Sequence, residues 1–224
     1  MNNFIEGQFD AVVIGAGHAG CEAALAAARM GVKTILFTIS NDAVANLPCN
    51  PSIGGTGKGH LVYEIDALGG EMGRAADLVT LQSRTLNLGK GAAVHSKRVQ
   101  ADRSEYKKIM KSTLEGQKNL RLIQSEIVEI LTEEADGVRR VVGVRTHLGE
   151  VWRADKVILA TGTFLESQIF VGDKVYYGGP DGMMPSRGLS DSLRGHGLSL
   201  MRFKTGTPAR VARRSIDLDA REVQ

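Results

Sequence analysis

The N-terminal part of the chain alternates between short apolar runs and one alanine-rich segment. The apolar run 11–14 is followed by three glycines, then by strong helix formers up to Arg29, and then by a second apolar run at 32–37. Short runs rich in Val and Ile on either side of a helix-forming segment are typical of two parallel strands joined by a helix. The pattern therefore predicts a βαβ unit at the start of an α/β fold.

The middle of the chain shows a different periodicity. Apolar residues recur at helical spacing over 61–68, and Gly69-Gly70 marks the end of that predicted helix. Asp102 with Glu105 three residues later predicts a capping box on a helix that continues to Gly116. Between these helices, 84–99 mixes glycines with basic residues and indicates a strand and a loop rather than a helix.

The pattern after the second helix is that of strands. A parallel-type strand is predicted at 120–124, and three short runs at 126–131, 139–147 and 151–153 predict an antiparallel β-meander inserted into the α/β order. The next run, 156–162, is apolar and ends in small residues, so we expect a wholly buried strand at the centre of the sheet, beside the first strand.

The amino-acid composition indicates the general class of protein. The 224 residues are 42% hydrophobic and 24% charged, which is typical of a soluble globular protein. The N-terminus carries an acid instead of a basic signal region, and no apolar run approaches the roughly 18 residues that a membrane span needs. We therefore expect a cytoplasmic protein that does not bind membranes, with Cys21 and Cys49 as free thiols and no metal site.

The charges are unevenly distributed although the net charge is only +3. The stretch 84–111 is rich in Lys and Arg, and in 187–214 the sole acid is Asp191. Two basic stretches of this kind suit a polyanionic partner, but a solvated basic face is an equally reasonable interpretation of the sequence.

The glycine-rich segment GAGHAG at 15–20 indicates a dinucleotide site. In such a motif Gly15 permits the turn, Gly17 allows the backbone to approach a pyrophosphate, and Gly20 allows close packing of the helix on the strand. An α/β turn that binds nothing is the alternative, and the βαβ context argues against it. The acid that usually follows the second strand is missing, and only Thr38 could bond a ribose, so the motif does not specify NAD.

The segment 40–60 is long for a connecting loop, and its prolines at 48 and 51 argue for order. Cys49 lies between them, while Lys58 and His60 stand at the start of the next predicted helix. A cation and a helix N-terminus lower the pKa of a thiol, so Cys49 is a candidate nucleophile. A small buried apolar cysteine is the alternative, and it is the expected state of Cys21.

Six motifs occur in one order along the chain: GAGHAG, CNPSIGGTGKGHL, DALGG, KGAAVHSKRVQADR, ATGTFL and KTGTPAR. Together they resemble the family of tRNA uridine 5-carboxymethylaminomethyl modification enzymes, MnmG, also called glucose-inhibited division protein A (GidA). The resemblance covers the chain from Phe9 onward. The family's proteins are much longer, and the chain is similar to their N-terminal third.

The resemblance implies a Rossmann-like FAD-binding domain of the glutathione-reductase type. On this basis, 1–200 form the FAD-binding domain, with the meander near 126–153, and 201–224 begin an inserted domain on the substrate and NADH side. The implied protein is a homodimer that works with the GTPase MnmE. It adds an aminomethyl or carboxymethylaminomethyl group to C5 of wobble uridine 34 of tRNA, with methylenetetrahydrofolate as carbon donor and NADH as reductant of the flavin.

The resemblance also implies roles for particular residues. Cys49 matches the family's N-terminal functional cysteine, and a thiolate that adds to C6 would activate C5 of uridine. The flavin site would comprise Gly15, Ala16, Gly17, His18, Ala19, Gly20, Thr38, Asn50, Gly54, Gly55, Ile127, Thr161, Gly162 and Ser186. The tRNA contacts would comprise Lys90, Arg98, Arg103, Arg202, Lys204 and Arg210.

Two other functions remain open at this stage. One is a folate- and flavin-dependent tRNA uridine-54 methyltransferase of the TrmFO type, which shares the fold and the cofactor. The other is a non-catalytic flavin-binding module, because the second functional cysteine and most of the NADH site of the family have no counterpart in these 224 residues. We therefore do not expect the 224 residues alone to catalyse the reaction.

Overall fold

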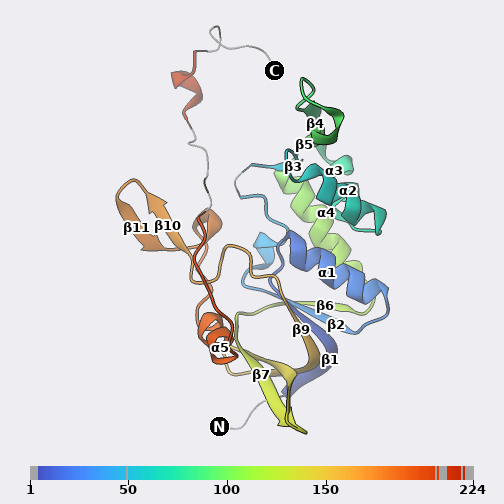
Figure 1. Cartoon of the computed structure of the whole chain (residues 1–224), viewed down its shortest axis with the longest axis vertical. Coiled ribbons are helices and arrows are strands. Elements are labelled where there is room, and N and C mark those ends of the chain that lie inside the picture. The colour runs from blue at the N-terminus through green and yellow to red at the C-terminus, as the bar shows by residue number, and fades with distance from the viewer. Residues whose placement is uncertain (1–4, 49, 205, 207–210, 218, 220–224) are drawn as a thin grey trace.

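The computed structural model describes residues 5–48, 50–204, 206, 211–217 and 219. Its centre is a six-stranded sheet in the order β6-β2-β1-β9-β8-β7 (Figure 1). Four strands are parallel, namely β6 (Leu120–Gln124), β2 (Thr34–Thr38), β1 (Ile5–Ile14) and β9 (Val151–Leu159). The other two, β8 (Val138–Thr146) and β7 (Ile127–Ala135), continue the sheet in antiparallel order.

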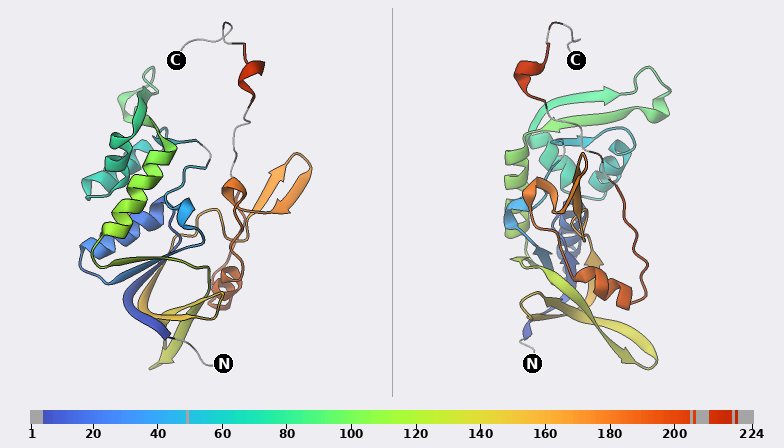
Figure 2. Two further views of the ribbon diagram at one scale, coloured as in Figure 1. Left: turned by 180° about the vertical axis from the view of Figure 1, so that it is seen from behind. Right: turned by 90° about the vertical axis from the view of Figure 1, so that its left-hand side faces the viewer.

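Each face of the parallel sheet has its own core. On one face, Val13 and Leu36 pack under helices α1 (His18–Arg29) and α4 (Arg103–Gly116). On the other face, Val12 and Phe37 pack against the meander strands and the short helix α5 (Leu189–Gly195) (Figure 2). Strands covered on both faces read as continuous apolar runs, which explains why the first two strands were recognisable in the sequence.

A smaller antiparallel sheet lies beyond the helices, in the order β3-β5-β4. Its strands are β3 (Ser52–Gly54), β5 (Ser96–Ala101) and β4 (Thr80–Leu86), and helices α2 (Gly59–Ala67) and α3 (Met72–Leu78) belong to the same region. A separate hairpin, β10 (Gln168–Val171) and β11 (Lys174–Tyr177), projects from the opposite side (Figure 1). The remaining elements are the 3-10 turns η1 (Asn41–Ala43), η2 (Ala92–Val94), η3 (Pro180–Gly182) and η4 (Arg213–Ser215).

The start of α4 confirms the Asp102 half of the predicted capping box but not the Glu105 half, because Asp102 N donates to Val79 O. One carboxylate oxygen of Asp102 accepts hydrogen bonds from the backbone N–H groups of Ser104 (2.9 Å) and Glu105 (3.0 Å). The Glu105 carboxylate accepts instead from Lys108 Nζ at 2.6 Å. The helix is therefore capped by Asp102, while the side chain of Glu105 takes part in an ion pair on the helix surface.

The structure corrects the expected division between meander and central strand. Residues 151–153 and 156–159 form one strand, β9, which pairs with β8 only over Val151–Arg153 and with β1 along most of its length. The strand is also less buried than expected, since Ile158 and Leu159 are 38% and 41% exposed. Beyond Arg153 the outer edge of β9 has no neighbouring strand among the described residues.

Several short elements were not predicted, namely β3, α3, the part of β4 before residue 84, β10 and β11. Each has few or no buried apolar residues of its own, so its periodicity in the sequence is weak. No helix among the described residues is long and apolar enough to cross a membrane. The expectation that 201–224 begin a second domain remains a prediction, because much of this range lies outside the described residues.

Candidate dinucleotide-binding site

The glycine loop joins the end of β1 to the start of α1, and its glycines have different surroundings. Gly15 has φ +102°, and a Cβ atom there would lie 2.3 Å from the carbonyl oxygen of Ala160. A Cβ atom on Gly20 would lie 1.7 Å from the carbonyl oxygen of Gly15. By contrast, a Cβ atom on Gly17 would meet nothing within 4 Å. The loop is thus pressed between α1 and the end of β9, with open space in front of Gly17.

The first turn of α1 is free to receive an anion. Its N-cap is Gly17, no side chain caps it, and no acidic residue lies in this turn. The first N–H groups of a helix have no partner within the helix, and they carry the positive end of its dipole. A pyrophosphate in front of Gly17 would meet the N–H groups of His18, Ala19 and Gly20, and this open cradle fits the dinucleotide that the motif predicts.

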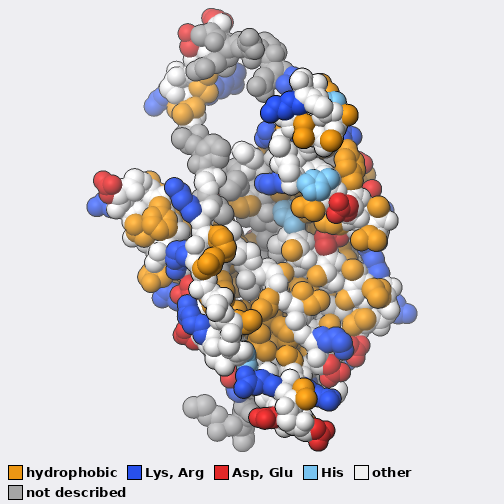
Figure 3. All heavy atoms as spheres, viewed as in Figure 1, with side chains coloured by type: hydrophobic (Ala, Val, Ile, Leu, Met, Phe, Trp, Pro, Cys, Tyr) orange, Lys and Arg blue, Asp and Glu red, His pale blue; other side chains and the backbone are white. Residues whose placement is uncertain are grey.

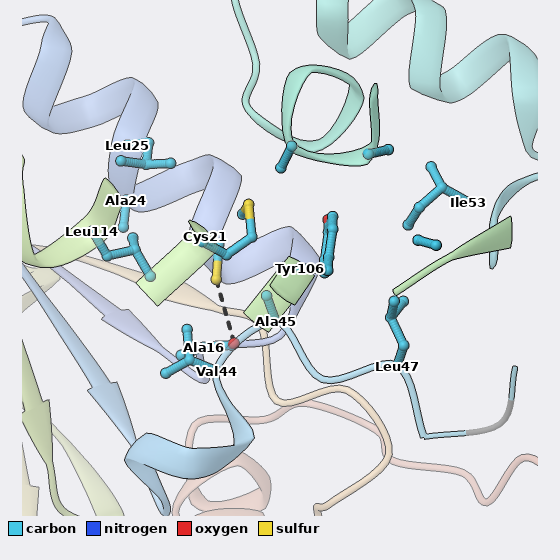
Figure 4. Close-up of a cluster of buried hydrophobic side chains, with 14 of the residues drawn as sticks. Ala16, Cys21, Ala24, Leu25, Val44, Ala45, Leu47, Ile53, Tyr106 and Leu114 are labelled. Atoms are coloured by element: carbon cyan, nitrogen blue, oxygen red, sulfur yellow. Dashed lines mark hydrogen bonds between the residues drawn. The ribbon is translucent and has the colours of Figure 1, made fainter. Parts of the chain in front are cut away.

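The underside of the loop is held by Ala16. Its carbonyl oxygen accepts hydrogen bonds from Ala45 N (2.9 Å) and from Cys21 Sγ (3.3 Å), the second of which is drawn in Figure 4. Cys21 is fully buried, and burial raises the pKa of its thiol to about 12. Cys21 is therefore a structural thiol that fixes the loop from below, in agreement with its expected packed state.

His18 is the first residue of α1 and is largely buried. Burial lowers the pKa of its imidazole, so the ring is neutral at physiological pH. Its Nε2 atom has no hydrogen-bond partner among the described residues, and its ring lies 5.7 Å, centroid to centroid, from the ring of Tyr106. The unpartnered Nε2 atom leaves the ring able to form a hydrogen bond to a group at the start of α1.

The ends of β2 and β6 form one side of the site. Ser125 N donates to Thr38 O at 2.9 Å, and the Thr38 hydroxyl donates to Ser40 O at 3.0 Å. Ser125 Oγ and Asn41 Oδ1 are buried without a partner among the described residues. Buried polar atoms are normally satisfied, so these two atoms fit the polar groups of a ribose or an adenine at this edge.

Neither Ser125 nor Asn41 was a candidate from the sequence. The signal that could have identified Ser125 is its position directly after β6, because the carboxyl ends of parallel strands share one edge of the sheet. Ile127 starts the next strand, β7, and its side chain is buried in the core beneath the sheet. A contact between Ile127 and a ligand would therefore use its backbone.

The other side of the site is formed by segments far apart in the sequence. Thr161 and Gly162 lie one residue beyond the end of β9, after Ala160, and Gly162 has φ +58°. Ser186 is buried and pairs with the segment after them, because Ser186 N donates to Phe164 O (2.9 Å) and Ser186 O accepts from Glu166 N (2.9 Å). The fold therefore brings Ser186 beside the loop that follows Gly162.

The long segment after β2 contacts strand β5 of the small sheet at two glycines. Gly54 and Gly55 have φ of +81° and +96°, and Gly55 N donates to Lys97 O at 2.8 Å. A Cβ atom on Gly54 would lie 2.3 Å from Lys97 O, so only glycine fits there. Asn50 O accepts from Ser52 N at 2.7 Å. Cys49 itself lies outside the described residues, and Lys58 is the N-cap of α2.

The predicted tRNA contacts lie in different surroundings. Lys90 and Arg98 are exposed on the region of β4 and β5, where blue side chains gather at the upper right of Figure 3. Arg202 Nη1 donates to Glu166 O at 2.9 Å, and Lys204 is exposed. Arg210 lies outside the described residues. The structure thus places the described members on several surfaces and does not join them into one patch.

Arg103 differs from the others because its guanidinium is engaged within the protein. It donates to Asn46 Oδ1 from Nη2 (2.7 Å) and Nε (3.2 Å), and it forms an ion pair with Asp181. Asn46 Nδ2 in turn donates to Asp181 Oδ2 at 2.8 Å. The three side chains line a cavity of about 590 Å³ between the start of α4, η1 and η3.

Comparisons with known proteins agree with this geometry. The family "Glucose inhibited division protein A" matches residues 10–224. The tRNA uridine 5-carboxymethylaminomethyl modification enzymes MnmG of Caldicellulosiruptor saccharolyticus and Alkaliphilus oremlandii are 58% and 55% identical, over 99% and 100% of this chain. The chain spans 35% of the length of each of these relatives.

Solved structures give the same relationship. Aquifex aeolicus GidA matches with a TM-score of 0.88 and 51% identity, over 95% of this chain and 35% of the other. The GidA-related protein from Thermus thermophilus matches with a TM-score of 0.60 and 27% identity, over 84% of this chain and 68% of the other. With a family match over nearly its whole length, the chain belongs to the glucose inhibited division protein A family.

Proposed function

We propose that this chain is the flavin-binding part of an enzyme that modifies C5 of the wobble uridine, position 34, of tRNA. The observation that carries the proposal is the uncapped start of α1, which Gly15 and Gly20 hold against β9 with open space in front of Gly17. This cradle suits a dinucleotide pyrophosphate. The family relationship supports FAD as that dinucleotide.

In this proposal, the adenosine and the flavin of FAD bind on opposite sides of the cradle. Thr38, Asn41, Ser125 and the backbone of Ile127 would hold the adenosine, since unpartnered polar atoms lie there. The flavin would lie on the side formed by the other candidate residues, Asn50, Gly54, Gly55, Thr161, Gly162 and Ser186. When bound, FAD supplies two-electron redox chemistry, for which NADH is the reductant.

Cys49 is the proposed nucleophile. Its thiolate would add to C6 of the uridine, which makes C5 nucleophilic towards the carbon donor, methylenetetrahydrofolate. C5 then bonds to the methylene carbon, and tetrahydrofolate leaves that carbon as the incoming amine bonds to it. Loss of the C5 proton and of the thiolate restores the C5–C6 double bond and frees the cysteine. Cys21 does not compete for this role, because its thiol is buried and its pKa is about 12.

The partners in this proposal are those of the whole protein. They are tRNA, the GTPase MnmE and a second copy of the protein in a homodimer in the cytoplasm. The exposed cations Lys90, Arg98, Arg202 and Lys204 are the described candidates for tRNA phosphates. Arg210 lies in the matching motif KTGTPAR, and Arg103 is a weaker candidate because Asn46 and Asp181 already engage its guanidinium.

Two measurements test the function. Flavin absorbance of the purified protein tests whether FAD binds. Nucleoside analysis of tRNA from a strain that lacks the gene distinguishes wobble uridine from uridine 54, the target of the TrmFO-type alternative. We expect loss of the modification at position 34 and its return when the gene is restored. Unchanged position 34 would contradict the proposal, and bound flavin without any effect on tRNA would favour the non-catalytic module.

A further inference from the structure

Strands β3 and β5 of the small sheet bury one face, whereas β4 is exposed on both faces along nearly its whole length. Ile53 and Val99 lie directly opposite each other in the register, and both are buried, at 6% and 8% exposure. Side chains alternate between the faces of a sheet. The side chains of Arg98 and Arg84 therefore point to the other side, where both are exposed, and Gly54 lies beside Arg98.

These three positions form one row across the sheet. Gly54 lies opposite Arg98, and Arg98 lies opposite Arg84. The stem of Arg98 passes beside the glycine loop, since a Cβ atom on Gly55 would lie 3.9 Å from its Cδ atom. Two arginines thus occupy directly opposed positions beside the loop that follows Cys49.

The next row is polar and uncharged. Ser52 lies opposite Gln100, and Gln100 lies opposite Gln82. No acid balances the arginines, because residues 80–101 contain Arg84, Lys90, Lys97 and Arg98 but neither Asp nor Glu. Among the described residues neither Arg84 nor Arg98 makes an ion pair or a side-chain hydrogen bond.

A like-charged pair at directly opposed positions of an antiparallel sheet is unfavourable by itself. A bound anion removes the repulsion, and the planar guanidinium matches a phosphate with two parallel hydrogen bonds. The surface is open, whereas small-molecule sites are concave, and the cavity beside α4 is lined by other residues. An open face with unpaired cations and amide donors suits an extended polyanion.

We propose that Arg84 and Arg98 together clamp a phosphate of the tRNA backbone on the outer face of this sheet, and so hold the RNA at the edge of the loop that carries Cys49. This inference rests on the proposed function, which it extends to Arg84 and to the outer face of the sheet. The contact positions the RNA and carries no sequence information.

The experiment measures binding of unmodified tRNA to the protein as its gene encodes it, at several salt concentrations. Arg84→Gln should weaken binding roughly fivefold and lower the slope of log K against log salt by about one. Arg84→Lys should recover part of the loss, because it keeps the charge but not the two parallel bonds. The double variant Arg84→Gln/Arg98→Gln should lose less than the product of the two single losses, because both side chains hold one phosphate.

Arg139→Gln is the matched control. Arg139 is also an exposed arginine on an antiparallel hairpin, but it lies opposite an acid, Glu134. Binding by Arg84→Gln that equals binding by this control, in strength and in salt slope, would overturn the proposal. The proposal would also be overturned if Arg84→Gln bound tRNA normally and lost only its binding to the GTPase partner. The two proposals can fail separately. If Arg84→Gln weakens tRNA binding but the wild-type protein does not modify uridine 34, the proposed function is refuted and the phosphate clamp is retained.

Discussion

A Cβ atom on Gly20 would lie 1.7 Å from the carbonyl oxygen of Gly15, a distance at which no real side chain can stand. Gly20 therefore sets how closely α1 approaches the end of β1. Gly17, three residues earlier, has room for a side chain and has extended backbone angles of −72° and −177°. One glycine serves the fold, and the other leaves space for a ligand.

This contrast gives the first prediction. Gly20→Ala should destabilise the protein by about 1–3 kcal/mol, because helix and loop must move apart. Gly17→Ala should leave the free energy of unfolding nearly unchanged but abolish flavin binding, since its methyl group takes the place of the pyrophosphate. Urea unfolding and flavin absorbance measure the two effects separately. A flavin-loaded Gly17→Ala protein would show that the pyrophosphate lies elsewhere.

The second prediction concerns the two cysteines. In the folded protein at neutral pH, iodoacetamide should label Cys49 and leave Cys21 unlabelled, because the Cys21 thiol is buried and its pKa is about 12. After denaturation both should react. Peptide mass spectrometry locates the label. Labelling of Cys21 in the native state, or a Cys49→Ser protein with full modification activity, would contradict the assigned roles.

The third prediction is a dependence of stability on alkaline pH. The pKa of the Cys21 thiol rises from 9.0 in an ordinary environment to about 12 in the fold, so above pH 9 the unfolded chain loses a proton that the native protein keeps. Stability should therefore fall as the pH rises from about 9 towards 12, by up to about 1.4 kcal/mol per pH unit for this group. Cys21→Ala should show a shallower decline.

Tyr106 requires a control in the same experiment. Burial also raises the pKa of its hydroxyl, with the same sign of effect on stability. Tyr106→Phe should flatten the upper part of the alkaline decline, and the two substitutions together should flatten most of it. An unchanged slope in Cys21→Ala, measured by urea unfolding between pH 8 and 11, would show that the thiol does not contribute.

The fourth prediction separates the structural role of Arg103 from tRNA binding. Arg103 and Asp181 are each about one third exposed, so their pairing should stabilise the fold by no more than about 1 kcal/mol. A double-mutant cycle with Arg103→Gln and Asp181→Asn measures that coupling by thermal unfolding. If Arg103 also contacts tRNA, Arg103→Gln will weaken tRNA binding more than Asp181→Asn does. Equal effects would assign Arg103 to the fold alone.

The fifth prediction tests the adenosine side of the site. Ser125→Ala removes a buried hydroxyl that has no partner among the described residues. The free energy of unfolding without flavin should change by less than about 1 kcal/mol, while affinity for FAD should fall by an amount equivalent to one hydrogen bond, about 0.5–1.5 kcal/mol. Titration of the flavin-free protein with FAD measures this. Ser190→Ala is a matched control, because the Ser190 hydroxyl is also buried but donates to Glu166 at 3.1 Å.

Much of the architecture was predictable, because strands buried on both faces are continuous apolar runs. The βαβ start and the strand at 120–124 lie close to their expected positions, and Asp102 caps its helix as its position indicates. The joining of 151–153 with 156–159 was not predictable, since Ala154 and Asp155 are residue types that are depleted in strands, and Asp favours turns. Pairing with β1 determines the outcome there.

The candidate site was predictable where backbone geometry needs glycine and less so where side chains meet through the fold. Gly15 and Gly20 could be identified from their spacing alone. The partner of Arg103 could not, because Asp181 lies far along the chain in a short turn. Nor could the pairing of Arg84 with Arg98, which depends on the register of two strands joined by a long loop.

The contact between Ala160 and Gly15 also determines at what point during synthesis the glycine loop can take its final shape. Gly15 follows β1 and Ala160 follows β9, which are the first and the last strands of the six-stranded sheet in chain order. The two strands can pair only after the meander between them has been synthesised. Contacts between such distant segments form late, since the chain between them must first be ordered. On a ribosome, the N-terminal motif would therefore remain unable to hold its cofactor until residue 160 has emerged, so flavin capture follows synthesis of this region.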